Sequence, residues 1–282
     1  MNYRHAFHAG NFADVLKHAV LARIVDYLKR KEGAFRVIDT HAGVGLYDLS
    51  SDEAGRTGEW ETGIARLLAT PALEPAADLL APYLGVVRAL NRDGLKFYPG
   101  SPLVTRRLLR KQDRLTAIEL HPADAAMLKA NFAGDHQVRV IELDGWLALG
   151  AHLPPKEKRG LVLVDPPFEK PDEFDTILKG IAKAHRRWPG GTYAIWYPIK
   201  KTEEVERFRQ GLAALAIPRI LDFRLTTRAA TPEPRLHGCG MAVINPPYLL
   251  EAEMAVLLPY LAKTLALDET ASGSAAWLAG EK

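Results

Sequence analysis

The chain has 282 residues, of which 48% are hydrophobic and 25% are charged, so it can bury one sizeable core and its bulk is not disordered. The formal net charge of +3 is mildly basic, which permits a nucleic-acid partner without requiring one. A single cysteine, Cys239, excludes a disulfide framework; with no signal-peptide pattern and no long apolar run, this predicts a cytoplasmic protein away from the membrane.

The N-terminal part of the chain predicts one helix and one buried strand. The helix is expected to begin at Asn11, whose side chain can cap it, with Asp14 in its first turn. The strand at 35–39 runs into a glycine-bearing turn at 40–45. From 46 to 98 the pattern changes to helical stretches broken by prolines, without a convincing strand. We therefore expect an inserted helical subdomain at 46–98, within a main domain formed by 1–45 and 99–282.

The rest of the chain alternates between strands and helices. Strands are expected at 115–119, 138–143, 161–165 and 192–197, and helices from 122, from 146, at 173–185 and at 203–215. This alternation predicts a mostly parallel sheet. Two further strands, 219–227 and 240–245, are separated by a proline-rich loop and should pair antiparallel. The prediction is an α/β fold with a seven-stranded Rossmann-like sheet whose last strand is reversed, followed by a low-complexity Ala/Ser/Gly-rich tail after Leu267.

Four consecutive parallel strands are each followed by a carboxylate, namely Asp39, Glu119, Asp144 and Asp165. Ligands of open α/β sheets bind beyond the carboxyl ends of the strands. Glu119 suits the two hydroxyls of a ribose, and Asp144, beside Gly145, could accept a hydrogen bond from an adenine amine. Any one of these acids could simply cap the next helix, but together they predict a bound nucleoside.

The glycine turn after the first strand favours S-adenosylmethionine (SAM) over a dinucleotide. The turn, which contains His41 and Gly43, lacks the full spacing of a phosphate-binding loop. Its glycines instead allow the backbone to approach a ligand without a pyrophosphate. Lys17 and His18 could contact the methionine carboxylate if the first helix packs over the cofactor; the alternative is that they are ordinary helix-surface residues.

The segment Asp165-Pro166-Pro167-Phe168, which follows a buried strand, carries the clearest chemical signal. An adenine N6 lone pair is delocalised into the ring, so N6 is a poor nucleophile. The Asp165 carboxylate and the Pro166 carbonyl can accept its two hydrogens, and Asp165 can then take the released proton. Phe168 offers a ring on which an extruded base can stack. The motif predicts methylation of an exocyclic amine.

Asn245-Pro246-Pro247-Tyr248 is a second candidate with a similar spelling. It ends the reversed strand, which delivers its C-terminus to the far edge of the sheet. We therefore expect Asn245 to form a rigid turn and not to be catalytic.

Three basic clusters could contact phosphates, or could be solvated helix faces and helix C-termini. They are Arg106, Arg107, Arg110, Lys111 and Arg114; Lys156, Lys158 and Arg159; and His185, Arg186 and Arg187. The histidines His5, His8, His18 and His41 show no ligand spacing, so no metal site is expected.

Several strings together closely resemble the RlmJ family, bacterial adenine-N6 methyltransferases of 23S ribosomal RNA, nearly from end to end. They are Tyr3-Arg4-His5-Ala6-Phe7-His8-Ala9-Gly10-Asn11, Ala13-Asp14-Val15-Leu16-Lys17-His18, Asp39-Thr40-His41-Ala42-Gly43, Tyr98-Pro99-Gly100-Ser101-Pro102, Glu119-Leu120-His121-Pro122 and Asp165-Pro166-Pro167-Phe168. The resemblance implies a class I SAM-dependent methyltransferase fold with a small helical subdomain after the first strand.

The resemblance also assigns residues. It implies SAM contacts by His18, His41, Ser101, Glu119, Asp144 and Gly145. It implies that Asp165 is the proton acceptor and that the N-terminal segment with Tyr3 and His5 faces the substrate. Phe168 replaces a tyrosine that many members carry, which preserves stacking but loses any hydrogen bond from the hydroxyl.

The expected reaction is transfer of a methyl group from SAM to N6 of a specific adenine in 23S rRNA. Because sequence-specific RNA readers favour unstacked bases, the expected substrate is protein-free rRNA or an early assembly intermediate; a monomeric enzyme is expected. The rivals are a DNA adenine-N6 methyltransferase, a protein glutamine methyltransferase and a non-catalytic RNA-binding protein.

Overall fold

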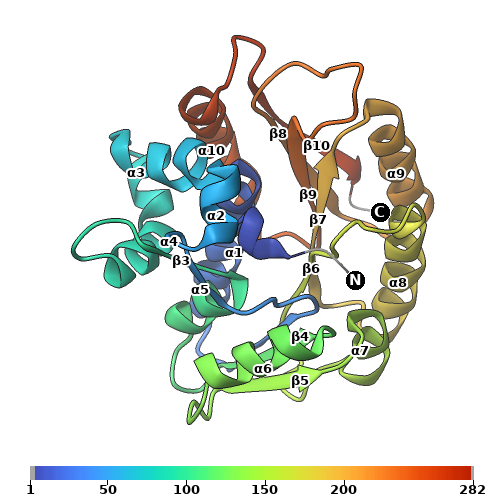
Figure 1. Ribbon diagram of the computed structural model, residues 1–282. Helices are drawn as coiled ribbons and strands as arrows, with labels where there is room; N and C mark the ends of the chain where they lie inside the picture. The colour runs from blue at the N-terminus through green and yellow to red at the C-terminus, as the bar shows by residue number, and fades with distance from the viewer. Residues whose placement is uncertain (1–3, 281–282) are drawn as a thin grey trace.

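The computed structural model describes residues 4–280 and is built around an eight-stranded sheet (Figure 1). The strand order is β10-β8-β9-β7-β6-β1-β4-β5. The strands of this sheet are β1 Arg36–Asp39, β4 Arg114–Glu119, β5 Val138–Glu142, β6 Gly160–Val164, β7 Thr192–Ile199, β8 Ile220–Thr226, β9 Gly238–Ile244 and β10 Ser272–Ala279.

Helices cover both faces of the sheet. One face carries α1 Phe12–Lys29, α5 Ser101–Leu108, α6 Pro122–Asn131 and α10 Leu250–Leu265; the other carries α7 Gly145–Ala151, α8 Glu173–Arg187 and α9 Thr202–Ala214 (Figure 1). A short 3-10 helix, η1 His5–Phe7, precedes α1. None of the helices in the described part of the chain has the length and apolar character needed to span a membrane.

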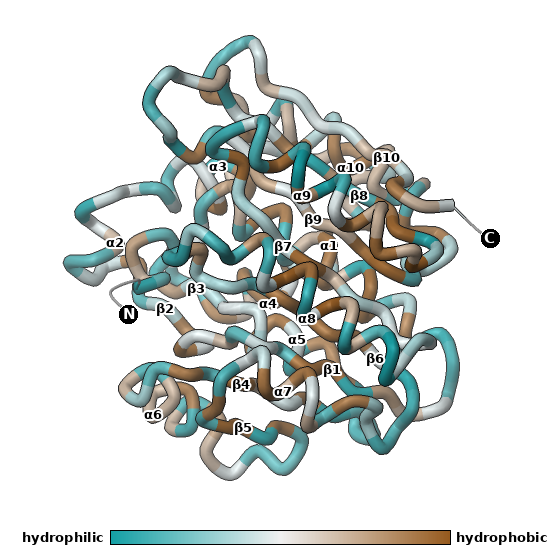
Figure 2. Tube along the Cα trace, turned by 90° about the vertical axis from the view of Figure 1, so that its right-hand side faces the viewer, coloured by the Kyte–Doolittle hydropathy of each residue, from teal (hydrophilic) through white to brown (hydrophobic). Residues whose placement is uncertain are grey.

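The alternation of side chains along β6 explains why its sequence is continuously hydrophobic. Leu161 and Leu163 belong to the core beneath α1, whereas Val162 and Val164 belong to the core beneath α8 and α9. Both faces of the strand are therefore buried, as in parallel sheets covered on two sides. Figure 2 shows hydrophobic positions gathered on the central strands and hydrophilic positions on the outer loops.

The sheet confirms the predicted fold class and adds a strand that the sequence analysis missed. Strands β1, β4, β5, β6 and β7 are parallel, and β9 lies antiparallel between β7 and β8, as predicted. The tail expected to be low in complexity instead forms β10, antiparallel to β8. Its small residues hid the strand because they lack a β-branched pattern. They also fit the packing, since a Cβ on Gly273 would lie 2.8 Å from the backbone of Leu258 on α10.

The segment 46–98 is mainly helical but is framed by two short strands. Its helices are α2 Asp52–Thr57, the π-helical turn Glu61–Ala65, α3 Arg66–Ala69 and α4 Ala76–Leu90. The expectation that it holds no strand was wrong, because β2 Leu46–Asp48 pairs antiparallel with β3 Phe97–Pro99. Strands of three residues give too little sequence pattern to detect. Ile64 and Leu80 share one hydrophobic core with α1 and α10, and the division at 45/46 and 98/99 stays a prediction.

Helix α1 is the element that brings polar side chains into the interior. The Asn11 side chain accepts hydrogen bonds from the amides of Ala13 and Asp14, at 2.9 and 3.0 Å, and so caps the helix as predicted. The helix lies between the sheet and the segment 46–98 (Figure 1). Because it is enclosed on several sides, Asp14, Lys17 and His18 are all buried, and each needs a partner inside the fold.

Candidate active site

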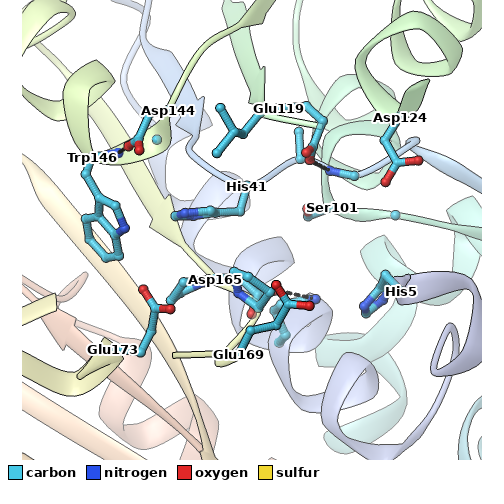
Figure 3. A pocket seen from close by; sticks show the side chains of 18 of the residues that line it. His5, His41, Ser101, Glu119, Asp124, Asp144, Trp146, Asp165, Glu169 and Glu173 are labelled. Carbon is cyan, nitrogen blue, oxygen red and sulfur yellow. Dashed lines mark hydrogen bonds and ion pairs between the residues drawn. The ribbon is translucent and has the colours of Figure 1, made fainter. Parts of the chain in front are cut away.

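A cavity of about 310 Å³ opens at the carboxyl ends of the parallel strands (Figure 3). It is lined by residues that follow β1, β4, β5 and β6, together with one face of α1 and the start of α5. The predicted site residues that line it are His5, Lys17, His18, His41, Gly43, Ser101, Glu119, Asp144, Gly145, Asp165 and Pro166. Most of the predicted site therefore comes together in one cavity.

Two predicted residues in the described part of the chain do not lie on the wall of this cavity. Asp39 is fully buried behind Ser101, whose hydroxyl donates a 2.6 Å hydrogen bond to it. Phe168 lines a neighbouring cavity of about 290 Å³. Tyr3 lies outside the described residues, so its predicted role at the substrate entrance stays a prediction.

The glycine turn after β1 fixes the carboxylate of Glu119. Gly43 has φ +59°, in the left-handed region that glycine adopts without strain. Its amide donates to Glu119 Oε2 at 2.9 Å, and the amide of His121 donates to Oε1 at 2.8 Å. Burial raises the pKa of Glu119. Each carboxylate oxygen keeps a lone pair for a further donor, so the residue can still receive a diol.

Two buried side chains at the cavity have a polar atom without a partner among the described residues. They are Asp39, at Oδ1, and His18, at Nε2. Burial raises the pKa of Asp39 to about 7 and lowers that of His18 to about 3. His18 Nδ1 lies 2.8 Å from the hydroxyl of Tyr98. Buried polar atoms normally find partners, so these two predict a polar ligand.

His41, Trp146 and Asp144 lie on the side of the cavity away from His5 (Figure 3). The rings of His41 and Trp146 meet edge to face, with centroids 5.4 Å apart. Burial lowers the pKa of His41 to about 4, so it is neutral near pH 7. Asp144 caps α7 by accepting from the amide of Trp146 at 2.7 Å, so the capping role that the sequence analysis kept open is real. The same carboxylate nevertheless faces the cavity.

Asp165 is held by an ammonium group from the first helix. Lys17 Nζ lies 2.6 Å from Asp165 Oδ2 and 2.7 Å from Asp14 Oδ1. Burial alone would lower the pKa of Lys17, but the charges of Asp14 and Asp165 hold it well above its ordinary value. The sequence analysis expects Lys17 to contact the methionine carboxylate if the first helix packs over the cofactor, and this contact stays a prediction. The structure directs the ammonium at Asp165 and at Asp14, a residue that the sequence analysis uses only as a first-turn acid.

Phe168 adopts an unusual backbone conformation at the end of the Asp-Pro-Pro-Phe motif. Its φ is +52°, which costs a residue other than glycine about 1–3 kcal/mol and is typical of functional sites. The ring packs edge-on against Phe174 and Trp196, with centroids 5.2 and 5.7 Å away. Phe168 therefore stands beside the main cavity, between it and the neighbouring one, whereas Pro166 lies on the main cavity wall.

Asn245 lies at the other edge of the sheet. It ends β9, which runs opposite to β6 and β7. Its side-chain amide donates to the carbonyls of Pro189 and Gly191 at 2.7 and 2.8 Å. These bonds tie the strand end to the start of β7, in agreement with a turn role for Asn245.

The three basic clusters also lie at the edge away from the cavity, because they precede β4, β6 and β7. In the first cluster Arg106 pairs with Asp135, and Arg110 donates to the carbonyls of Lys29 and Lys31 at 3.0 and 2.8 Å. These contacts tie helix and strand ends together, as the non-binding alternative proposed.

The sequence analysis missed several residues around the two cavities. Trp146 lines the main cavity, and Glu169, Lys170 and Glu173 line both cavities. Lys200 and Lys201, at the end of β7, border the neighbouring one. Glu173 is buried, which raises its pKa, and receives a hydrogen bond from Trp146. Their place after β5, β6 and β7 was the only signal in the sequence.

Comparisons with known proteins show to which family this chain is related. A family model described as "Ribosomal RNA large subunit methyltransferase D, RlmJ" matches residues 32–279. Two proteins named ribosomal RNA large subunit methyltransferase J are similar over their full length and over all of this chain. The one from Haemophilus influenzae is 45% identical and the one from Escherichia coli is 43% identical.

A crystal structure of a Legionella pneumophila protein superposes with a TM-score of 0.86 at 33% sequence identity. The match covers 98% of this chain and 99% of that one, so the arrangement of the sheet and helices, with the segment 46–98, has a counterpart in an experimental structure. With the full-length identity to the two methyltransferases, it follows that this chain belongs to the RlmJ family.

Proposed function

We propose that this protein transfers a methyl group from SAM to N6 of an adenine in 23S ribosomal RNA. The observation that carries the proposal is the position of Asp165, at the carboxyl end of β6 and on the wall of the main cavity beside Pro166. Family membership supports a methyltransferase and therefore SAM as the methyl donor. The curated relatives are named for ribosomal RNA of the large subunit, which supports this class of substrate.

The donor set around the cavity fits SAM. Asp39 Oδ1 can accept from the ammonium of the methionine part, and Ser101 lies beside it. If Nδ1 of neutral His18 accepts from Tyr98, its Nε2–H is free to donate to the methionine carboxylate. Glu119 suits the ribose hydroxyls, and Asp144 suits the adenine amine.

The residues around Asp165 can perform the chemistry of amine methylation. SAM, when bound, supplies an electrophilic methyl group on its sulfonium. The Asp165 carboxylate and the Pro166 carbonyl accept the two N6 hydrogens and so return electron density to nitrogen. As the new N–C bond forms, the methyl–sulfur bond would break with S-adenosylhomocysteine as the leaving group, and the N6 proton facing Asp165 ends on the carboxylate. Lys17 holds that carboxylate at 2.6 Å.

We infer that the RNA approaches over the carboxyl edge of the sheet. Lys170, Lys200 and Lys201 stand there around the cavity that Phe168 lines. Within residues 4–280, Lys170 and Lys200 form no ion pair, whereas Lys201 pairs with Glu204 at 2.9 Å. Ammonium groups without a protein partner are available to phosphates. A monomer acting on protein-free rRNA or an early assembly intermediate is the form we propose.

The test is methyl incorporation from labelled SAM into four substrates side by side: deproteinised 23S rRNA, RNA without adenine, duplex DNA and bulk protein. Asp165→Ala serves as the inactive control. Label confined to 23S rRNA, recovered as N6-methyladenine and lost in the variant, is the expected result. Label in DNA or in protein glutamine would replace the ribosomal substrate by one of the rivals, and no label anywhere would support a binding protein.

A further inference from the structure

Asp14 is a buried acid that the proposed chemistry does not yet use. Its side chain is 1% exposed, and it is not among the residues that line the main cavity. A buried ionised carboxylate costs several kcal/mol unless it is paired and hydrogen-bonded. Its partners should therefore explain why it is there.

The partners of Asp14 link two parts of the active site. Oδ1 lies 2.7 Å from Lys17 Nζ. Oδ2 lies 2.9 Å from His5 Nε2 and accepts a 2.9 Å hydrogen bond from the amide of Gly10. Burial alone would raise the pKa of Asp14, but the charges of His5 and Lys17 hold it well below its ordinary value. The carboxylate is therefore ionised, and it joins α1 to the segment before it.

The ammonium of Lys17 is shared between two carboxylates. Its distances to Asp165 and to Asp14 are nearly equal, at 2.6 and 2.7 Å. An ammonium that faced Asp165 alone would concentrate its charge there, because Coulomb attraction at such a distance is strong in a poorly hydrated site. Asp165 would then bind a hydrogen of N6 less strongly and would be a weaker proton acceptor. Asp14 offsets part of that charge.

We propose that Asp14 is a positioning residue for methyl transfer. It orients Lys17 toward Asp165, shares the ammonium charge so that Asp165 remains an effective proton acceptor, and fixes His5 at the cavity. The inference rests on the proposed function, since it assumes that Asp165 receives the proton.

Other titratable groups surround Asp14, Lys17 and Asp165. They are unchanged in every variant described below. Those facing Asp14 are His5, His8, Lys17, His18, Glu59, Tyr83, Tyr98 and Cys239. Those facing Asp165 are Lys17, Asp39, His41 and Cys239.

The test is Asp14→Asn in the full-length protein, compared with Asp26→Asn. Asp26 lies on the same helix, outside the cavity lining, and pairs with Lys29 at 3.2 Å and with Arg23 at 3.5 Å, so it controls for the loss of one ion-paired negative charge on this helix. Single-turnover methylation of 23S rRNA is followed from pH 3.5 to pH 9 with saturating SAM, because an aspartate ordinarily titrates near pH about 3.9, and SAM binding is measured by calorimetry. Saturating SAM also stabilises the folded state by mass action.

We expect Asp14→Asn to bind SAM within about threefold of wild type but to methylate at least about tenfold more slowly, with the acid limb of its pH–rate profile moved to lower pH. Asp26→Asn should match wild type in SAM binding, in methylation rate and in the position of the acid limb. A purely structural role would instead lower SAM binding and rate together and leave the acid limb in place. That outcome, or a wild-type rate in Asp14→Asn, would overturn the proposal.

If Asp14→Asn does not fold even with SAM, Asp14→Glu provides the answer. It keeps the charge but moves the carboxylate by one methylene, so we expect a reduced rate with the acid limb unmoved. A wild-type rate despite the displaced carboxylate, or a reduced rate with a displaced limb, would overturn the proposal. Failure of the proposed function is distinct, because wild-type protein would then not methylate rRNA at all.

Discussion

Replacing Asp39 by asparagine should stabilise the protein and weaken its binding of SAM. Asp39 is fully buried, its Oδ2 accepts from Ser101, and its Oδ1 has no partner among the described residues. Asparagine has the same shape and can still accept from Ser101 through its side-chain oxygen. It carries no charge, however, so it cannot pair with the ammonium of the cofactor.

The size of the effect follows from the pKa of Asp39. Burial raises it to about 7, from an ordinary value of 3.8. Below pH 4 the group is protonated in the folded and unfolded chains alike, and stability is unaffected. As the pH rises toward 7, only the unfolded chain releases its proton, so folding becomes less favourable. The loss reaches about 4 kcal/mol above pH 7, at 1.36 kcal/mol for each unit of pKa difference.

Urea unfolding of wild type and Asp39→Asn, without SAM, measures this effect. The increase in the free energy of unfolding of the variant over wild type should be about 3 kcal/mol larger at pH 8 than at pH 5. This figure uses the same 1.36 kcal/mol for each unit of pKa difference. Calorimetry with SAM should show at least about tenfold weaker binding by the variant at pH 8. Asp93→Asn, in an exposed turn, controls for the loss of one surface charge and should show neither change. An equal stability difference at pH 5 and pH 8 would refute the neutral, unpaired state of Asp39.

Two further predictions concern the edges of the sheet. Lys170→Gln combined with Lys200→Gln should weaken RNA binding and reduce the slope of the log binding constant against log salt concentration by about 1.4, since each phosphate contact with a single strand contributes about 0.7 to that slope. Lys156→Gln combined with Lys158→Gln, exposed at the other edge, is the matched control, and an equal effect there would refute the RNA path. Asn245→Ala should lose about 2 kcal/mol in urea unfolding, because two hydrogen bonds to carbonyls disappear. It should keep its methylation rate, and an inactive but folded variant would make Asn245 a catalytic candidate.

The features that the sequence predicted well are those that neighbouring residues determine. Asn11 caps α1 through amides two and three residues ahead, so the start of the helix follows from local sequence. Four strand-end carboxylates could be placed at one edge because parallel strands share their direction. The Asp-Pro-Pro-Phe motif is contiguous, so its chemistry could be stated from its spelling.

The features that were missed depend on contacts between distant parts of the chain. Lys17 and Asp165 are separated by 148 residues, and no periodicity reveals that their side chains meet. The ring of Phe168 packs on Phe174 and Trp196, which the motif alone does not specify. Strand β10 consists largely of small residues and becomes a strand because β8 offers it an edge to pair with.

The charges around the site explain why it should favour a cationic cofactor. Asp14 and Asp165 share the ammonium of Lys17, and His5 also pairs with Asp14, so an ionised Asp39 would add an excess negative charge that has no ion-pair partner among the described residues. Asp39 holds its proton up to about pH 7, which limits that excess while the cofactor is absent. SAM brings a sulfonium and an ammonium. Because a cation beside Asp39 favours its ionised form, SAM binding should release a proton near pH 7, and SAM affinity should rise as the pH rises through that value. Asp39, which destabilises the folded protein in the absence of SAM, thus acquires a positively charged partner when SAM binds.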